Sequence, residues 1–586
     1  MTGGKRLRGA EAVVRALEDE GIPFTFGIPG THNIELYDRL GESELVHAIL
    51  VTDEQSASFM ADGLWRASGH LGCVSVVPGA GLTHAMSGIA EAYLDHIPML
   101  VLGCGIRRDT GHAFQLHDVD QLAMVSPVTK GVFRPGRGDE IYSTIRGACA
   151  LARSGAPGPV MVEIPASLYM RPDHAPPGAD PVVGPVAKAA PSPTSDEVEA
   201  VANLLAHAHR PLLYLGAGAA AAGLDLVTLA ELLESPVATT LQGKGVFPES
   251  HPLSVWPGFG AAAPPFARDI ASTCDATLAI GCRFAEVGTG SYGLQPPVPL
   301  VHVDIDPAAI GANFPPEIGL VADAGELVAA LVPALRARGR TGSGSAGADL
   351  REAIREGRDE VRREQRSATG AGRVTPGILL EALQATLGAE TIYSTDSGNG
   401  TFLAAECLTL DAPGQFLAPV DFSCMGYSVP AAIGAALGRP ETPVVALIGD
   451  GAFLMTGLEI LTAAHRGLPI AFLVLRDREL AQIAQFQSTL YNRKQSSVLP
   501  DYDLGAIASG TGVDCLHITK NDDIDTVVGE VAGRLADGRP VVVDVAIDYS
   551  RKTWFTRGVV RTNLGRLPWR DRLRMVSRAL TRRVTG

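Results

Sequence analysis

Short, continuous apolar runs recur along the chain, and they constrain its fold more than any other feature of the sequence. Clear examples are CVSVV at 73–77, PLLYLG at 211–216 and PVVALIG at 443–449. A strand that is apolar at every position is buried on both faces, as in a parallel sheet covered by helices on both sides. Because helical patterns separate these runs, the sequence predicts an α/β fold of doubly wound parallel sheets.

Two stretches of different composition divide the runs into three blocks. A proline-rich stretch from Arg171 has the composition of an extended connector, because proline lacks a backbone donor and fixes φ. A charged stretch rich in glycine, serine and arginine, 337–374, is expected to be a second linker. We therefore predict three doubly wound parallel-sheet domains and a basic C-terminal helical tail. The predicted bounds are 1–180, 190–340 and 372–550 for the three domains and 551–586 for the tail.

The charge is unevenly distributed. The net charge is −15, and the tail carries 11 Lys and Arg against one acid, Asp571, so the tail is +10 and the remainder about −25. An acidic body excludes a general nucleic-acid binder. Eight cysteines without CxxC pairs argue against a disulfide framework or a zinc site. Without an N-terminal apolar h-region or a long uncharged apolar run, we expect a soluble cytoplasmic protein.

The run at 443–449 ends in Gly449-Asp450-Gly451, and a helical pattern follows. Ligands of parallel sheets bind at the carboxyl ends of strands, beside helix N-termini whose amides favour anions. Asp450 is suited to a hard cation that bridges phosphate oxygens. Alone, these residues would also suit a tight strand-to-helix turn of any α/β protein. However, 24 residues follow Gly451, the last of them in a second apolar run, and the chain then reads Arg476-Asp477-Arg478-Glu479.

This spacing resembles the thiamine-diphosphate motif, and the resemblance extends over nearly the whole chain to the acetolactate synthase and pyruvate oxidase group. In the motif, Gly-Asp-Gly is followed by Asn-Asn, and Mg²⁺ is bound by the aspartate, the second asparagine and a carbonyl two residues later. The resemblance implies Asp450, Asp477 and the carbonyl of Glu479 as metal ligands. An aspartate oxygen can replace that of an asparagine on a hard cation, and Arg476 would offset the added charge.

Two further segments resemble cofactor-binding parts of the family. STDSGNGTF is similar to the turn that contacts the diphosphate, and FSCMGYSVP to the segment whose bulky side chain supports the bent cofactor. The resemblance therefore implies a cofactor-binding set of Ser397, Gly398, Asn399, Gly400, Met425, Gly449, Asp450, Gly451 and Ala452.

HAILVTDEQSASF resembles the family segment whose glutamate hydrogen-bonds the aminopyrimidine ring, at Glu54 here. A carboxyl in apolar surroundings has a raised pKa, which suits a shared proton. Asp53 is the better candidate for the N-terminal acid of the following helix. The first domain would then bind the pyrimidine and the third the diphosphate. Because the family builds each site between two subunits, a homodimer or homotetramer is implied.

The resemblance also suggests residues near the substrate. His32, in FGIPGTHNIELYD, falls where benzaldehyde lyase has its active-site histidine and is the candidate acid or base; a solvent-facing or N-capping histidine is the alternative. Gln115, in GHAFQLHDVDQ, matches a synthase glutamine that would donate to a substrate carbonyl or carboxylate. His84 stands where asparagine is usual. Decarboxylases have a glutamate where this chain has Ile483, which favours carboligation.

The central block resembles the FAD-binding domain of acetolactate synthase, through segments such as HVDIDPAAIG at 302–311. Some relatives keep this fold without flavin. The glycines of LGAGAAAAG are a weak signal, so the sequence leaves FAD binding open.

In the tail, Trp569, Leu573, Val576 and Leu580 share one helical face with arginines around it. Such a basic amphipathic helix would suit contact with a membrane surface. The alternative is a helix docked on its own acidic body, which the charge difference slightly favours.

Together these features predict a homo-oligomeric carboligase or lyase that depends on thiamine diphosphate and Mg²⁺. It would decarboxylate a 2-oxo acid, with pyruvate as the expected donor, and transfer the carbanion to a carbonyl acceptor, as acetolactate synthase does. The alternatives are a non-ligating 2-oxo acid decarboxylase or a benzaldehyde-lyase-like acyloin lyase. Arg476-Asp477 suggests a cofactor-dead binding subunit, and the tail suggests a membrane-recruited flavin oxidase.

Overall fold

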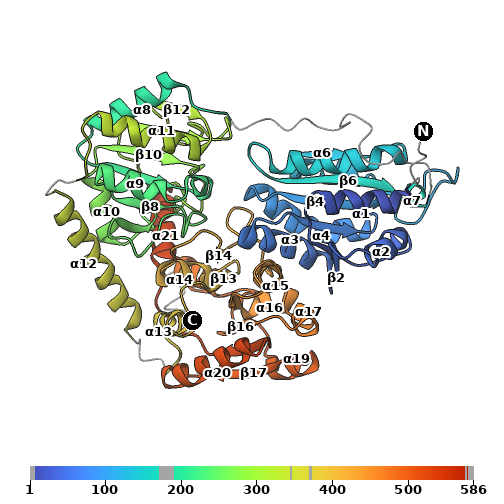
Figure 1. Cartoon of the computed structure of the whole chain (residues 1–586). Coiled ribbons are helices and arrows are strands. Elements are labelled where there is room, and N and C mark those ends of the chain that lie inside the picture. The colour runs from blue at the N-terminus through green and yellow to red at the C-terminus, as the bar shows by residue number, and fades with distance from the viewer. Residues whose placement is uncertain (1–6, 171–190, 343–345, 368–371, 575–576, 579–586) are drawn as a thin grey trace.

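The computed structural model describes residues 7–170, 191–342, 346–367, 372–574 and 577–578. They form three six-stranded sheets in which every strand pair is parallel. Figure 1 shows the three sheets as separate layered units, with helices around each and the first and third units in contact. The predicted α/β class with three doubly wound sheets is confirmed. Among the described helices, none is long and apolar enough to cross a membrane.

The first sheet has the strand order β2-β1-β3-β4-β6-β5. Its strands are β1 (Phe24–Gly27), β2 (His47–Leu50), β3 (Gly72–Val76), β4 (Met99–Gly105), β5 (Gly131–Phe133) and β6 (Pro159–Pro165). Its helices are α1 (Gly9–Asp19), α2 (Ile34–Leu40), α3 (Glu54–Ser68), α4 (Ala80–Leu94), α5 (Gln121–Val125), α6 (Ile141–Arg153) and α7 (Ala166–Tyr169). The proline-rich connector predicted from Arg171 falls mostly on 171–190, outside the described residues.

The central sheet has the order β12-β11-β10-β7-β8-β9, which is the dinucleotide-binding order with its switch point between β7 and β10. Its strands are β7 (Pro211–Leu215), β8 (Val237–Thr239), β9 (Ser254–Pro257), β10 (Ala276–Ile280), β11 (Leu300–Asp304) and β12 (Ile318–Val321). Its helices are α8 (Ser195–His207), α9 (Asp225–Leu233), α10 (Pro265–Ser272) and α11 (Ala324–Ala337).

The third sheet, β14-β13-β15-β16-β18-β17, repeats the order of the first. Its strands are β13 (Ile392–Thr395), β14 (Phe416–Leu417), β15 (Val444–Gly449), β16 (Ile470–Leu475), β17 (Asp514–Ile518) and β18 (Val541–Val545). Its helices are α13 (Pro376–Leu387), α14 (Asn399–Cys407), α15 (Ser428–Gly438), α16 (Asp450–Thr456), α17 (Ile460–Arg466), α18 (Ala481–Tyr491), α19 (Leu504–Gly510) and α20 (Ile524–Ala536).

The first and third domains share one hydrophobic core, and its centre is the crossing of α3 with α15. Two glycines allow the close approach. A Cβ at Gly63 would lie 2.2 Å from the carbonyl oxygen of Ala431, and one at Gly434 would lie 2.0 Å from that of Met60. The two helices therefore meet almost backbone to backbone.

The stretch predicted as a second linker is mostly helical. Helix α12 (Ala346–Arg366) runs along the outside of the central domain towards α13 (Figure 1). Leu350, Ile354 and Val361 are buried, and their spacing places them on one face beneath the charged residues. The high charge of the stretch obscured this narrow apolar face.

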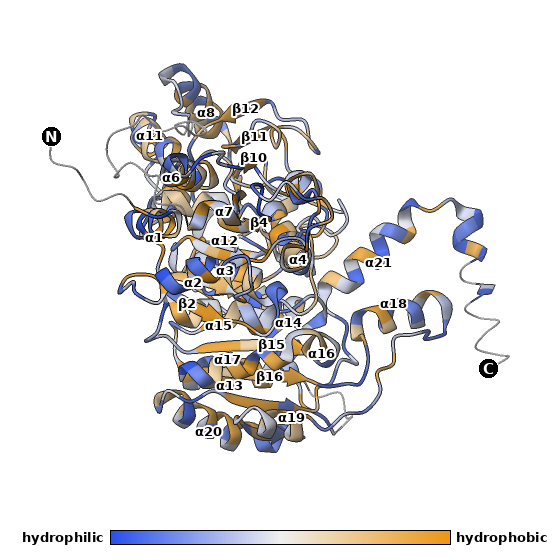
Figure 2. Ribbon diagram, turned by 90° about the vertical axis from the view of Figure 1, so that its right-hand side faces the viewer, coloured by the Kyte–Doolittle hydropathy of each residue, from blue (hydrophilic) through white to orange (hydrophobic). Residues whose placement is uncertain are grey.

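The first part of the tail is the helix α21 (Trp554–Arg566), which packs on the central and third domains. The ring of Phe555 stacks on Phe402 at 3.7 Å, and the Arg566 guanidinium donates to the carbonyl of Tyr292. Beyond α21 the chain projects from the body (Figure 2), and Trp569 and Leu573 are exposed. Docking on the body of the protein therefore accounts for the position of α21. Val576 and Leu580 lie outside the described residues.

Candidate active site

A cavity of about 130 Å³ lies at the carboxyl ends of β13, β15 and β16 in the third domain. This is the switch point of the sheet, since β13 and β15 are neighbours whose connections leave in opposite directions. All the residues predicted to bind the diphosphate or the metal line it. They are Ser397, Gly398, Asn399, Gly400, Met425, Gly449, Asp450, Gly451, Ala452, Asp477 and Glu479. The structure therefore brings together residues that are far apart in the sequence.

Two helices begin at the edge of this cavity. Helix α14 starts at Asn399 and α16 at Asp450, so the free amides of both first turns are near the cavity, where they favour an anion. At Gly398, whose φ is 137°, and at Gly449, a Cβ would meet no atom within 4 Å. The glycines thus leave open space beside the amides.

Asp450 and Asp477 supply two carboxylates to the same cavity. Asp450 accepts hydrogen bonds from the amides of Arg478, at 2.7 Å, and Gly451, at 2.9 Å. Asp477 accepts one from the amide of Glu479 at 3.2 Å. Burial raises the pKa of Asp450, and burial and then the charge of Asp450 raise the pKa of Asp477 to about 7. Two close carboxylates with raised pKa values are stabilised by a cation between them.

Arg476 does not line the cavity, but its charge acts on Asp450, where it opposes the rise in pKa that burial causes. Its guanidinium donates to Asp544 at 2.8 Å and to the carbonyl of Tyr502 at 2.9 Å, and it lies 4.7 Å from the centre of the Tyr502 ring. The side chain of Glu479 forms an ion pair with Lys494, so we assign that side chain no role in binding the cation. A divalent cation is therefore the natural partner of the two aspartates, and the residues present fit a diphosphate held through such a cation.

The segment that carries Met425 is held by an acid that sequence reasoning missed. Asp396, buried at the end of β13, accepts hydrogen bonds from the amides of Gly426, at 3.0 Å, and Ser428, at 2.9 Å. Burial raises its pKa to about 7. Glu91 of the first domain accepts from the amide of Cys424 at 2.9 Å. The side chain of Met425 is thus placed in the cavity by acids from two domains.

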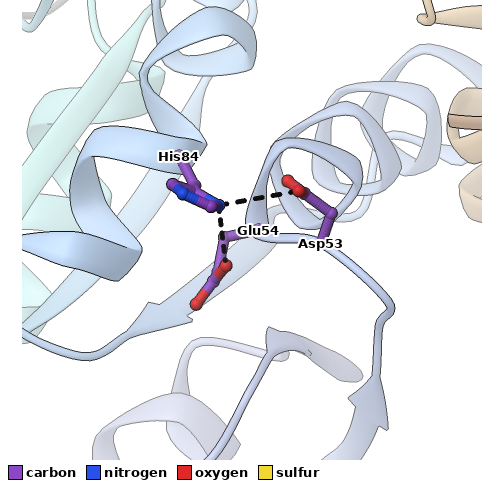
Figure 3. A group of neighbouring side chains, drawn as sticks. All are labelled: Asp53, Glu54 and His84. Carbon is purple, nitrogen blue, oxygen red and sulfur yellow. Dashed lines mark ion pairs between the residues drawn. The ribbon is translucent and has the colours of Figure 1, made fainter. Parts of the chain in front are cut away.

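Glu54 lies at the start of α3, in the first domain, and among the described residues no part of that domain lines the cavity. Its side chain is 10% exposed. Asp53 is the N-cap of α3 and accepts from the amide of Gln55 at 2.7 Å, as expected for this acid. His84, from α4, points at both acids (Figure 3), and its Nδ1 lies 3.5 Å from Asp53 and 3.6 Å from Glu54.

The turn before Glu54 is held by the third domain. Glu459, which is fully buried, accepts hydrogen bonds from the amide of Thr52 at 3.1 Å and from its hydroxyl at 2.6 Å. Nothing in the local sequence points to this contact, because the two residues are 407 positions apart.

His32 lies in the loop after β1, and its ring is 5.5 Å from that of His117. Burial lowers the pKa of His32, and His117 lowers it further. Gln115 belongs to the same loop as His117, and among the described residues no hydrogen bond joins its side chain to another predicted site residue. A different glutamine anchors that loop. Gln121 is buried, accepts from the amide of Gly79 at 3.2 Å and donates to the carbonyl of Cys104 at 2.8 Å.

A second cavity, of about 280 Å³, lies at the switch point of the central sheet. It is lined by residues after β7 and β10, including Gly218 and Gly281, and by Asp304 at the end of β11. Arg283 closes it towards the other domains, donating to Asp421 at 2.6 Å and to His96 at 3.0 Å.

Comparison with known proteins finds three successive matches along the chain. Three family models match: the N-terminal TPP binding domain of thiamine pyrophosphate enzymes over residues 7–124, their central domain over 198–331 and their C-terminal TPP binding domain over 396–545.

Curated relatives match over most of their length. The chain is 33% identical over 568 residues to the probable acetolactate synthase large subunit of Methanocaldococcus jannaschii, and the match covers 92% of each chain. It is 32% identical to the acetolactate synthase large subunit of Corynebacterium glutamicum, covering 94% of this chain and 88% of that one. The large subunit of acetolactate synthase isozyme 3 from Escherichia coli is 29% identical, with 94% and 96% covered.

Proposed function

Because the chain belongs to the family of thiamine pyrophosphate enzymes, we propose that it decarboxylates pyruvate and joins the remaining fragment to a carbonyl acceptor, as its acetolactate synthase relatives are named for doing. The observation that carries this proposal is the third-domain cavity, since every predicted diphosphate and metal residue lines it. An intact cavity of this kind argues against the cofactor-dead binding subunit.

The third domain would bind the cofactor. Asp450, Asp477 and the carbonyl of Glu479 would hold Mg²⁺, and the amides at the starts of α14 and α16 would donate to the diphosphate. When bound, thiamine diphosphate supplies a cationic ring that can accept the electron pair released by decarboxylation. Met425 would support the ring system from one side, in the position that Asp396 and Glu91 impose on its segment.

Glu54 would hold a proton at its carboxyl oxygen and exchange it with the aminopyrimidine ring. Because Glu54 is remote from the cavity lining of its own chain, we assign it to the cavity of a second copy, in a homodimer or homotetramer. His32 and Gln115 would then face the substrate from the loops after β1 and β4. Of these, His32 is the candidate acid or base, since its lowered pKa leaves it neutral near pH 7.

Carboligation is favoured over simple release of an aldehyde by one lining residue. Ile483 faces the cavity from α18, and an isoleucine has no proton to give to the fragment that remains after decarboxylation. A fragment that is not protonated persists long enough to meet a second carbonyl. The non-ligating decarboxylase and the acyloin lyase are therefore the runners-up.

The test is a product analysis of purified protein supplied with thiamine diphosphate, Mg²⁺ and a panel of 2-oxo acids. We expect pyruvate to give CO₂ and acetolactate. Acetaldehyde as the main product would replace the proposal with a plain decarboxylase. Cleavage of acyloins without any 2-oxo acid consumption would replace it with a lyase. If titration with thiamine diphosphate and Mg²⁺ gives neither heat nor thermal stabilisation, the enzyme proposal fails.

A flavin nucleotide is the ligand we propose for the central cavity. The strand order is that of dinucleotide-binding sheets, the cavity lies at their switch point, and Asp304 stands at the end of a neighbouring strand, where an acid can accept from a ribose hydroxyl. Gly216 and Gly281 allow the close backbone approach there, since a Cβ at Gly216 would lie 2.0 Å from the Gly281 carbonyl oxygen. Purified protein should then show the visible absorption of flavin; colourless, fully active protein would contradict this and remove the oxidase alternative.

Contact of the tail with membranes remains a prediction. The exposed Trp569 and Leu573, with arginines beside them, support it. Flotation of the full chain with anionic vesicles, compared with a chain ending at Leu567, would test it. If the full chain and the shortened chain float equally, the tail has no role in membrane contact.

A further inference from the structure

Three side chains with metal-binding atoms converge at the first-domain edge, apart from the cavity of the third domain (Figure 3). The ligand atoms of Asp53, Glu54 and His84 all lie within 4.8 Å of one another. His84 Nδ1 is 3.5 Å from Asp53 and 3.6 Å from Glu54. A tetrahedral ion with bonds of about 2.0–2.2 Å separates its ligands by about 3.4 Å, so two of the three separations already match.

The alternative is an ordinary ion pair between the histidine and the acids. Charge-assisted hydrogen bonds of this kind are about 2.7–2.9 Å long, and both contacts of His84 are longer than that. Within the described chain, the Glu54 carboxylate receives no hydrogen bond, although its side chain is nine-tenths buried. Its neighbour His84 lies 3.6 Å away, and an ion between the three groups would give the carboxylate a direct contact with a positive charge.

The surroundings also orient the ligands. One carboxylate oxygen of Asp53 accepts the capping hydrogen bond from Gln55, which leaves the other oxygen turned towards His84. His84 is 60% exposed, so an ion can enter from solvent. Outer hydrogen bonds that fix a ligand in this way are typical of metal sites.

The chemistry of the ligands indicates which ion would bind. The third-domain site offers only oxygen atoms, which suit Mg²⁺, whereas this group includes an imidazole nitrogen, which suits zinc, copper or nickel. We propose that, in the cofactor-free protein, Asp53, Glu54 and His84 bind a divalent transition-metal ion that blocks thiamine diphosphate by occupying Glu54. The blocking part rests on the function proposed above for Glu54; the binding part does not.

Zinc titration of cofactor-free protein, followed by calorimetry in excess Mg²⁺ to fill the all-oxygen site, tests the binding. We expect one zinc site per chain. His84→Asn should weaken it on the order of 100-fold, and Asp53→Asn, which keeps a helix-capping side chain, should weaken it as well. His70→Asn is the matched control, since His70 is exposed at the other end of α3. Unchanged zinc affinity in His84→Asn would overturn the site.

Competition tests the blocking role. Thiamine diphosphate with Mg²⁺ should release zinc from the wild-type protein, measured with a coloured zinc indicator, and zinc should raise the apparent Kd of the cofactor. If zinc stays bound while the cofactor binds normally, the blocking role is wrong. If the cofactor fails to bind even to zinc-free protein, the proposed function fails, and the zinc titration still decides the site.

Discussion

The first and third domains have the same strand order, yet their corresponding edges carry different chemistry. In the third, the loops at the carboxyl ends of the strands enclose a cavity that is lined by four acids, among them Asp450 and Asp477, and has two helix N-termini at its edge. In the first, the same edge carries the buried Glu54 beside the exposed His84. The sheet is common to both, so the residues that follow the strands decide what each edge can do. The residues of the third domain are suited to binding an anion together with a cation, and those of the first domain are suited to transferring a proton.

The two domains also hold each other by equivalent contacts. Glu459 lies after β15 and binds the amide of Thr52, just before α3; Glu91 lies after β3 and binds the amide of Cys424, just before α15. Each glutamate follows the third strand, in chain order, of its own sheet. Each accepts a hydrogen bond from the turn before a helix of the other domain, and that helix follows the second strand of the other sheet. Both fixed turns carry a predicted cofactor residue, Glu54 or Met425. The domains therefore position each other's functional segments.

The largest test of this division is Glu54→Gln. If the first domain handles only the proton, turnover should fall roughly 10²- to 10⁴-fold, the usual contribution of general acid–base catalysis. Binding of thiamine diphosphate and Mg²⁺, measured by calorimetry, should persist, because the third domain supplies the diphosphate and metal contacts. Two results would contradict this division between the domains. One is an unchanged turnover, and the other is a loss of cofactor binding while the turnover per bound cofactor is retained.

In the third domain the matched change is Asp450→Asn. Asp450 accepts two amide hydrogen bonds and would also bind the cation, and an asparagine has only one accepting oxygen. Cofactor affinity in the presence of Mg²⁺ should fall on the order of 100-fold. Asp477→Asn should have the smaller effect, about tenfold or less, because one oxygen remains for the cation and Asp477 accepts only one amide. Equal losses in both variants would contradict these assignments.

The sequence predicts residues that lie in one strand–turn–helix unit and misses those that act across domains. Gly449 to Ala452 and Ser397 to Gly400 each directly follow an apolar run, so their place at a sheet edge could be inferred. Glu459 and Glu91 lie in helical segments and act on partners more than 300 positions away. The contacts of Arg476 were missed for the same reason, since its partner Asp544 lies on another strand. A sequence pattern shows which face of an element is buried, not which element covers it.

The crossing of α3 and α15 is the next feature to test. Gly63→Ala or Gly434→Ala places a Cβ against a backbone carbonyl that cannot rotate away, so each should cost about 1–3 kcal/mol and lower the melting temperature. Gly533→Ala is the control. It lies within α20 with open space around it, and should stabilise by up to about 1 kcal/mol. A neutral effect at Gly63 and Gly434 would show that the domains need not meet so closely.

The last test is the pH dependence of stability at Glu91. Burial, and then the charge of Asp95, raise the pKa of Glu91 to about 8, above its ordinary value of 4.5. Between these two values the folded protein holds a proton that the unfolded chain releases, so stability falls as pH rises, by up to about 1.4 kcal/mol per unit. Glu91→Gln should flatten the melting temperature between pH 5 and 8, whereas Glu44→Gln, at an exposed acid, should keep the wild-type profile. A slope unaffected by Glu91→Gln would mean that Glu91 is ionised when it holds the Met425 segment, and that the two domains are coupled through a charge instead of a neutral carboxyl.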